Sequence, residues 1–344
     1  MRYLFMLLLV IGNGFLLAQN RVGEINHAEH YNYKLDYRVN YFDKMIFKVD
    51  VNTDIDNFYI PKLNYTNDRR SIFSPDEQLK LRFSFDYKFL GISYSFSPDF
   101  IPENNYKKAD TKTLDLSFKF FYSDRLRQEV IFKQVKGFTL KNPDDLSPID
   151  VFNDLQINTL GGKTFYIMNN NFSYRAYESQ TERQLKSAGT FMPSLSYYLN
   201  NLYTNNPNHN IESLSRIRSF DLRFQFGYMY NYVINKTWFA TGGLHPGIGI
   251  NASKSYYENS GFTREENNPK VLHYNFDFNF SLGYNHENFF SGISANYKNY
   301  QYDNSKISDI MSTKFNALLF IGYRFNEVKG VKKVFETLEK KLHL

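Results

Sequence analysis

The sequence predicts an all-β fold: a transmembrane antiparallel up-and-down β-barrel of about 12 strands, or else about 14, followed by a short C-terminal amphipathic helix. Three observations predict this class. The chain begins with an export signal, its composition is polar yet rich in aromatic residues, and long segments alternate apolar and polar side chains.

Residues 1–18 have the layout of a secretory signal peptide. Arg2 gives a positive start, residues 4–11 are apolar, and the stretch ends in the small residue Ala18. A membrane-anchoring helix needs about 20 apolar residues, and residues 12–14 (Gly-Asn-Gly) interrupt this one. We therefore expect export through the Sec pathway, cleavage after Ala18 and a location in the cell outer membrane.

The composition is unusual for an exported soluble protein. The chain has 28 tyrosines and 34 phenylalanines, and aromatic residues make up 18% of it. Yet hydrophobic residues total only 42% and the mean hydropathy is −0.51. Such a balance suits a barrel wall in which every second residue faces lipid and aromatic girdles mark the interfaces. The chain has no cysteine, which excludes disulfides and thiolate–metal sites. Its 41 basic and 35 acidic residues are scattered, so we expect no nucleic-acid partner.

Alternation with period two recurs along the chain. It is strictest in 79–89, 113–122, 220–230, 272–284 and 315–325, and weaker in 44–52, 91–98, 125–136, 155–168, 172–180, 188–200, 238–250 and 289–300. These segments are long for the strands of a soluble β-sandwich, which usually have about five or six residues. Five and eight make thirteen, whereas single-chain bacterial barrels have an even number of strands. One segment is therefore not a strand, and we place it between 137 and 200 or among the first strands.

The rest of the chain divides around this barrel. Residues 19–42 are expected to form an N-terminal periplasmic or lumenal segment, 43–326 the outer-membrane barrel and 327–344 the C-terminal helix. In the last segment the apolar residues recur at helical spacing: Val331, Val334, Phe335, Leu338 and Leu342. We expect this helix to pack under the barrel mouth, with binding to the membrane surface as the alternative.

Charged residues on the alternate positions of the strands are expected to face the lumen. They are Lys80, Arg82, Asp86, Lys88, Asp115, Lys119, Asp221, Arg223, Asp277 and Arg324. Both signs occur close together, which favours paired networks that fill a modest barrel over a filter of one sign. An anion-preferring pore is the alternative.

Candidate catalytic residues are few. His273, Asn275 and Asp277 share one predicted lumenal face, but same-face neighbours on a strand lie about 7 Å apart, too far for a direct chain of hydrogen bonds. His27 and His30 lack the spacing of a helical zinc motif, and Gly247 and Gly249 lack the remainder of a dinucleotide fingerprint. We expect no catalytic residues, no metal site and no cofactor.

The stretch FSYRAYESQTERQLKSAGTFMPSLSYY, residues 172–198, interrupts the alternation with charged and small residues. The periodicity places Phe172, Tyr174 and Ala176 on an outward stripe, Arg175 inward, and 180–186 in a loop between strands. It also predicts that Arg175 pairs with Glu178 or Glu182.

This stretch resembles the signature of a Bacteroidota family of predicted outer-membrane proteins known as domain of unknown function 4421. The positions that fit are Ser173, Tyr174, Arg175, Ala176, Glu182, Gln184, Lys186, Ser187, Ala188, Gly189 and Phe191. Thr190 stands where serine is common, and 86–96, the Asn-Asn turn near 169 and 241–251 also look similar. The resemblance implies an outer-membrane barrel, and since the family has no established activity it implies no reaction. It makes Tyr174, Arg175, Glu182, Lys186, Ser187 and Gly189 the candidate motif residues, with His273, Asn275 and Asp277 as minor lumenal candidates.

We therefore expect an outer-membrane β-barrel protein that is not an enzyme and is either structural or a narrow or plugged channel. Its expected partners are outer-membrane lipids and, during insertion, the barrel-assembly machinery. Two alternatives stay open: a membrane-embedded hydrolase acting on lipid or peptide, and a soluble periplasmic β-sheet binding protein. The sequence does not fix the oligomeric state.

Overall fold

The computed structural model describes residues 36–60, 71–76, 79–105, 109–142, 147–203, 214–259, 262–267, 270–302 and 311–342. Over these residues, 12 antiparallel strands form a closed barrel, and each strand pairs with the next one along the chain. The ring consists of β2 (Lys44–Ile60), β4 (Leu79–Tyr87), β5 (Leu90–Phe96), β6 (Lys112–Phe121), β7 (Leu126–Lys141), β8 (Pro148–Tyr166), β10 (Ala188–Tyr203), β11 (Leu214–Asn235), β12 (Trp238–Asn259), β14 (Val271–Asn285), β15 (Phe289–Tyr302) and β16 (Met311–Asn326). The last strand closes on the first, with Asn326 opposite Lys44 and Met311 opposite Tyr59. The predicted fold class and the lower strand count are confirmed.

Four further strands and three helical segments complete the described chain. β3 (Ser71–Ser74) pairs with both β2 and β7, and β13 (Phe262–Asn267) pairs antiparallel with the last residues of β12. β1 (Arg38–Asn40) pairs with β9 (Glu182–Gln184) in a separate small sheet. The helical segments are the 3-10 turn η1 (Pro102–Asn105), α2 (Tyr174–Tyr177) and α3 (Lys329–Leu342). No helix in these ranges has the length and hydropathy of a membrane span.

The predicted strand at 172–180 is wrong. This segment contains α2 and the turn after it, and Phe172 and Ala176 are buried where an outward stripe was expected. The miscounted segment therefore lies between 137 and 200, as the parity of the strand count indicated.

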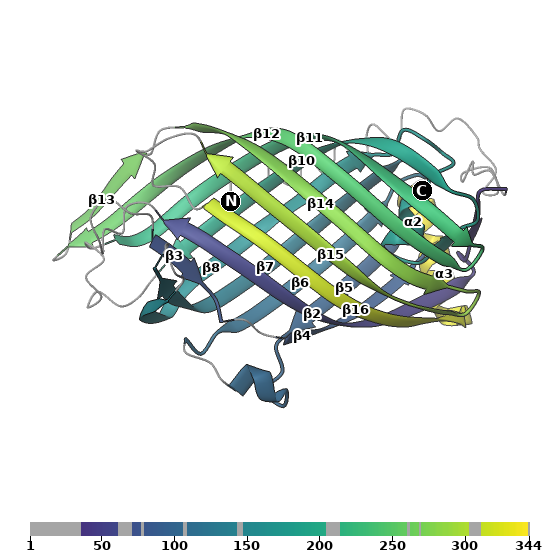
Figure 1. Ribbon diagram of the computed structural model, residues 1–344, viewed down its shortest axis with the longest axis horizontal. Helices are drawn as coiled ribbons and strands as arrows, with labels where there is room; N and C mark the ends of the chain where they lie inside the picture. The colour runs from purple at the N-terminus through teal and green to yellow at the C-terminus, as the bar shows by residue number, and fades with distance from the viewer. Residues whose placement is uncertain are drawn as a thin grey trace.

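The two ends of the barrel differ (Figure 1). One end carries α2, α3 and the short connections 88–89, 122–125, 236–237 and 286–288, and the other carries β3, β13 and the longer connections. Short turns face the periplasm in bacterial barrels. We therefore call these the periplasmic end and the outer end.

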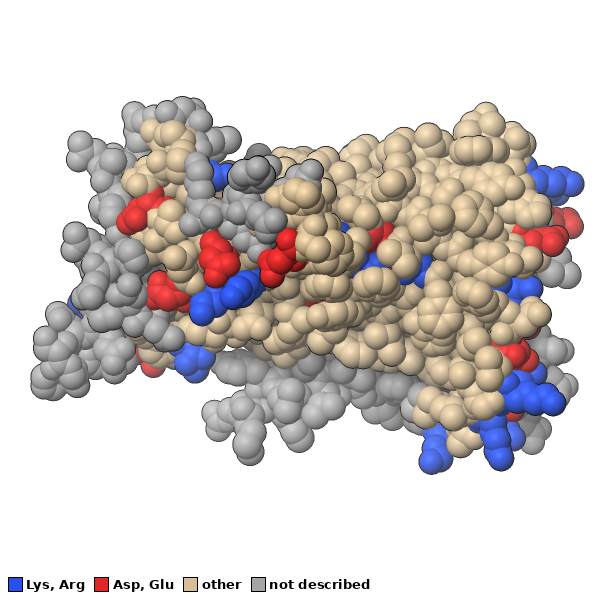
Figure 2. All heavy atoms as spheres, turned by 90° about the horizontal axis from the view of Figure 1, so that it is seen from below, with Lys and Arg blue, Asp and Glu red and all other residues tan. Residues whose placement is uncertain are grey.

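The outward face of the wall is apolar along most of its length. Exposed side chains such as Phe224, Leu244, Phe278 and Leu319 alternate with buried polar ones. Figure 2 shows a wide stretch of uncharged surface over the barrel, with most Lys, Arg, Asp and Glu side chains gathered toward its two ends. An uncharged band between two charged ends is the surface that a bilayer requires.

The helix α3 packs on the barrel at its periplasmic end. Phe335 is buried, and its ring lies 4.7 Å from the ring of Tyr87 and 5.5 Å from that of Phe89. Tyr87 and Phe89 were expected at the end of a lipid-facing stripe, but the helix covers both. Lys88 does not face the lumen either, because it lies in the turn and pairs with Glu339 of α3 at 2.8 Å.

Phe335→Ala is expected to release α3 while the barrel stays closed, because the substitution removes most of the apolar contact of the helix. Truncating a buried phenylalanine costs about 3 kcal/mol or more. Limited trypsin digestion should then cut the lysine-rich helix faster, with the heat-modifiable gel shift of the barrel retained. Val334→Ala is the matched control, since that neighbouring side chain is 57% exposed. Equal cleavage rates in the two variants would contradict this packing role.

Candidate functional site

The connection between β8 and β10, residues 167–187, turns into the barrel at the periplasmic end. We call this segment, together with β1, the plug. Ser173 caps α2, since its hydroxyl accepts a hydrogen bond from the Ala176 amide at 2.9 Å, and Gln180 turns the chain with a φ of 59°. β9 then returns the chain toward β10 while pairing with β1. The stretch of family-like residues thus forms a folded insert, where a loop between strands was predicted for 180–186.

The carboxylate of Glu178 is the centre of the first group of plug contacts. It forms an ion pair with the buried guanidinium of Arg127 on β7, and the Lys119 ammonium of β6 lies 3.4 Å from it. Lys48 on β2 donates to the Glu178 carbonyl at 2.9 Å. Burial alone would raise the pKa of the Glu178 carboxyl, but these three cations outweigh burial and hold that pKa at about 2. Glu178 is therefore ionised at neutral pH and ties the plug to three strands.

Arg127 is enclosed by aromatic rings as well as by its ion pair. Its guanidinium lies 4.9 Å from the ring centre of Phe121, 5.2 Å from that of Phe165 and 4.8 Å from that of Tyr174. A guanidinium so placed interacts favourably with the faces of the rings. Burial raises the pKa of the Tyr174 phenol, so this ring stays neutral beside the cation.

Glu182 is the centre of the second group, and it is fully buried. It accepts from the Ser173 hydroxyl at 2.5 Å and from Arg38 of β1 at 3.3 Å, and Arg175 lies 3.9 Å away. Arg38 also pairs with Asp124 in the β6–β7 turn at 2.8 Å. The prediction that Arg175 pairs with Glu178 or Glu182 is confirmed: its partner is Glu182, and Arg127 and Lys119 hold Glu178.

Arg175 holds the plug through more than this pair. It donates to the Lys88 carbonyl at 2.7 Å and lies 3.7 Å from the ring centre of Phe121. The two contacts fix α2 against the β4–β5 turn and the end of β6.

Arg324 of β16 and Asn231 of β11 bind the plug from other sides. Arg324 donates to the Gln180 carbonyl at 2.9 Å, and its guanidinium stacks 4.1 Å from the ring centre of Tyr41. Asn231 donates to the Ser173 carbonyl at 2.9 Å. The plug is thus bonded to strands around the whole ring.

The remaining motif residues lie at the end of the plug and at the start of β10. Lys186 stands 5.4 Å from the ring centre of Tyr37, and the Ser187 hydroxyl accepts from the Val233 amide at 2.9 Å. Gly189 lies under Tyr228, where an added Cβ would come within 2.0 Å of the phenol oxygen. These contacts are structural, and the motif residues do not converge on a common point where a substrate could react.

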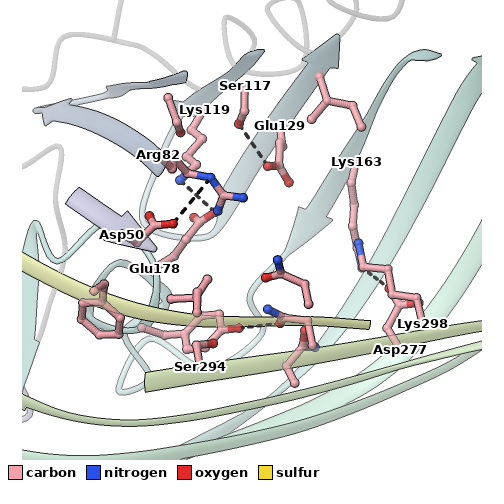
Figure 3. A pocket seen from close by; sticks show the side chains of 18 of the residues that line it. Asp50, Arg82, Ser117, Lys119, Glu129, Lys163, Glu178, Asp277, Ser294 and Lys298 are labelled. Carbon is pink, nitrogen blue, oxygen red and sulfur yellow. Dashed lines mark hydrogen bonds and ion pairs between the residues drawn. The ribbon is translucent and has the colours of Figure 1, made fainter. Parts of the chain in front are cut away.

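A polar cavity of about 320 Å³ lies in the lumen with the plug as its floor. Its wall carries seven cationic and six anionic side chains, which are Lys48, Arg82, Lys119, Lys133, Lys163, Lys298 and Lys314, and Asp50, Asp54, Asp115, Glu129, Glu178 and Asp277. Figure 3 shows Asp50 and Arg82 at one side of the cavity and Lys163, Asp277 and Lys298 at the other. Asp54 accepts from Lys133 at 2.8 Å and from Lys80 at 3.0 Å, and Asp277 contacts Lys163 at 3.4 Å. Nearly balanced, paired charges agree with the predicted network and not with a filter of one sign.

The outer half of the lumen is apolar on one side. Buried side chains of β3, β7, β8, β10 and β11 pack there into one cluster, which comprises Phe73, Val135, Phe138, Leu140, Phe152, Leu155, Ile157, Leu202 and Ile217. Along β7 the inward residues therefore change from Arg127 at the plug, through Glu129 and Lys133 at the cavity, to Val135 near the outer end.

The three minor candidates on β14 face inward; His273 has its own partner, whereas Gln225 and Lys163 link Asn275 to Asp277. His273 is buried 3.1 Å from Asp221, Asn275 accepts from Gln225 at 3.0 Å, and Asp277 pairs with Lys163. Asp221 also pairs with Arg223. Among the described residues, no group of three His, Asp or Glu side chains could hold a metal ion. His27 and His30 lie outside the described residues, as do 1–18 and most of 19–42.

Two of the four arginines that hold the plug were not predicted. Alternation within 125–136 would have placed Arg127 inward, opposite Val130 and Phe132, and this signal was present in the sequence. Arg38 gave no such signal, because it precedes the first barrel strand and its partners Asp124 and Glu182 are distant in sequence.

A family model described as "Domain of unknown function (DUF4421)" matches residues 35–325. The chain belongs to this family. The match covers the barrel and the whole plug, so residues 173–187 of the motif lie in the plug of a DUF4421 barrel and residues 188–191 begin its strand β10.

Solved structures with a similar fold are outer-membrane proteins. OmpT of Vibrio cholerae is 10% identical over 82% of this chain and 97% of its own, with a TM-score of 0.33. The translocator domain of the autotransporter NalP from Neisseria meningitidis is 9% identical over 81% and 88%, with a TM-score of 0.41. The outer membrane protease OmpT from Escherichia coli is 8% identical over 84% and 98%, with a TM-score of 0.34. No curated protein matches this chain.

Proposed function

We propose that this protein is a plugged outer-membrane channel whose own β8–β10 connection closes the lumen at the periplasmic end. One observation carries the proposal: Glu182 is buried and Glu178 is partly buried in the lumen, and there they meet Arg38, Arg127 and Lys119. A buried carboxylate costs several kcal/mol unless it is paired, so the plug is stable only in this docked position. An insert that fills the lumen in this way blocks ions in the resting state and leaves a polar chamber above it.

We further propose that the chain comes from a Bacteroidota species, leaves the cytoplasm through the Sec pathway and loses residues 1–18. Insertion by the barrel-assembly machinery and direct contact with outer-membrane lipids complete this proposal. The apolar outer wall and the family membership support it.

We propose a non-enzymatic role. His273 and Asp221 form the pair that most resembles part of a catalytic site, but both are buried and Asp221 is shared with Arg223. His273→Gln is therefore not expected to change lipid or peptide turnover, because the His273–Asp221 pair stabilises the barrel wall.

Planar-bilayer recording of the purified wild-type protein tests the closed channel directly. We expect silent insertions without steady conductance at neutral pH, because the docked plug fills the periplasmic half of the lumen. Insertion is verified independently by the heat-modifiable gel shift of the same reconstituted sample. Stable ohmic steps from the wild-type protein would show that the plug does not seal the lumen.

A further inference from the structure

The outward face of β10, β11 and β12 changes character abruptly near the outer end. Three successive cross-strand rows are Leu199, Phe220 and Ala252; then Asn201, Arg218 and Lys254; then Tyr203, Arg216 and Tyr256. Neighbouring rows on one face are about 7 Å apart along the strands. The wall therefore passes from purely apolar to basic within one row, as a barrel surface is expected to do where the lipid headgroups begin.

The second and third rows bring three positive charges together. Arg218 and Lys254 are direct register partners on neighbouring strands, and Arg216 follows Arg218 on the same face. Like charges directly opposite each other destabilise a strand pair. A ligand with negative charge would turn this repulsion into attraction.

Lys254 has a carboxylate contact that the two arginines lack among the described side chains. Glu265 of β13 contacts the Lys254 ammonium at 2.5 Å, and both side chains are about half exposed. Among the side chains that the structure describes, no carboxylate lies within 4 Å of the guanidinium of Arg216 or of Arg218. The lumen differs in this respect, because its cations lie among nearly as many carboxylates.

Neutral side chains orient the two guanidinium groups. Arg216 donates through Nε to Asn201 at 2.5 Å, and Arg218 lies 5.5 Å from the ring centre of Tyr256. Guanidinium groups held by neutral partners keep their charge and their terminal N–H groups for bidentate phosphate contacts.

We propose that Arg216, Arg218 and Lys254 bind a phosphorylated glycolipid of the outer leaflet. The phosphate lies between Arg218 and Lys254, Asn201 and the tyrosines face the sugar, and the acyl chains lie along Leu199 and Phe220. The leaflet follows from the position of the cluster, which is at the end opposite α3 and the short turns (Figure 1). The proposal rests on the outer-membrane location given under the proposed function, and it is independent of whether the plug seals the lumen.

The test is a thermal titration of the full-length protein in detergent. Three probes are added separately: a phosphorylated diglucosamine lipid, the same lipid without its phosphates, and inorganic phosphate. The midpoint of the heat-modifiable gel shift is measured for the wild type, for the triple variant R216Q/R218Q/K254Q and for the control K333Q/K340Q/K341Q. The control removes the same number of positive charges from α3, at the other end of the barrel.

We expect the phosphorylated lipid to raise the midpoint of the wild type and of the control alike. The triple variant should need about tenfold more of it or show no shift, because charge-assisted contacts to phosphate are lost. An equal response of the triple variant, or an equal loss in the control, would overturn the proposal. So would an equal response of the wild type to the dephosphorylated lipid, or an equal response to inorganic phosphate alone.

If the triple variant does not fold, R218Q alone answers the question in the same titration. The bilayer recordings give a separate readout, since failure of the proposed channel closure appears there as wild-type conductance and leaves the lipid titration unchanged.

Discussion

Replacing the plug with a short turn is expected to convert a silent barrel into a conducting one. In this variant residues 172–186 are replaced by Asn-Gly, which joins Asn171 to Ser187. The join is short because the chain already comes together there, with the Asn169 side chain donating to the Gly189 carbonyl at 2.7 Å. Asn-Gly favours the tight turn that connects antiparallel strands. The cavity then loses its floor, so ions can enter it from the periplasmic end.

The measurement is single-channel recording of the turn variant beside the wild type, with the heat-modifiable gel shift as proof of a closed barrel. Arg175→Ala is the milder companion, because it removes the bond to the Lys88 carbonyl and the contact with Phe121 while the plug stays in the chain. It should give brief openings rather than a permanent pore. A turn variant that folds yet stays silent would place the seal in the apolar cluster of the outer half instead of in the plug.

Acidification is expected to release the plug through Glu178. The direction of this pH effect follows from the pKa of Glu178, which is about 2 in the docked plug and 4.5 for an ordinary glutamate side chain. A carboxyl whose pKa falls on docking stabilises the docked state fully above pH 4.5, and this contribution is lost as the pH falls toward about 2. A shift of this size corresponds to about 3 kcal/mol. Docking should therefore be strongest at neutral pH and weaken steeply below about pH 4.

Plug release can be followed by limited proteolysis or by conductance as the pH is lowered. Glu178→Gln should lose the steep part of the profile and should already be weakened at neutral pH, because Arg127 then lies buried without its carboxylate. Glu336→Gln is the control, since this carboxylate is exposed on α3. A wild-type profile that the Glu178 substitution leaves unchanged would show that the pair with Arg127 does not hold the plug.

A second comparison separates the ion pair from the packing around it. Arg127→Met alone leaves Glu178 buried with fewer cations, and breaking one partner of a buried pair costs about 3–5 kcal/mol. Combining Arg127→Met with Glu178→Gln removes both charges and should recover part of this loss.

Much of the wall could be predicted from the sequence because it depends on local alternation. Phe224, Leu244 and Phe278 each face lipid, and on their strands polar residues alternate with such apolar ones. Because bacterial barrels have an even number of strands, one of the thirteen predicted strands could be recognised as an error. The plug could not be predicted in this way. Phe172, Tyr174 and Ala176 alternate like a strand, but this stretch is too short to distinguish a strand from one helical turn. Its conformation is decided by Arg127, Arg324 and Asn231, which reach it from strands distant in sequence.

The same reasoning applies to Tyr87 and Phe89. Their stripe correctly indicates an outward direction, but whether the neighbour is lipid or protein depends on where α3 docks. The alternation of residues predicts which face of a strand a side chain lies on, but it does not predict whether lipid or protein contacts that face.

The plug also bears on how the ring closes during assembly. It contacts Lys48 on the first barrel strand and Arg324 on the last, the two strands whose pairing completes the circle. Docking of the plug and joining of the seam must therefore favour each other by the same free energy. The same segment therefore links the two strands of the final junction, and in a chain that has not closed its ring Lys48 and Arg324 cannot hold it at the same time.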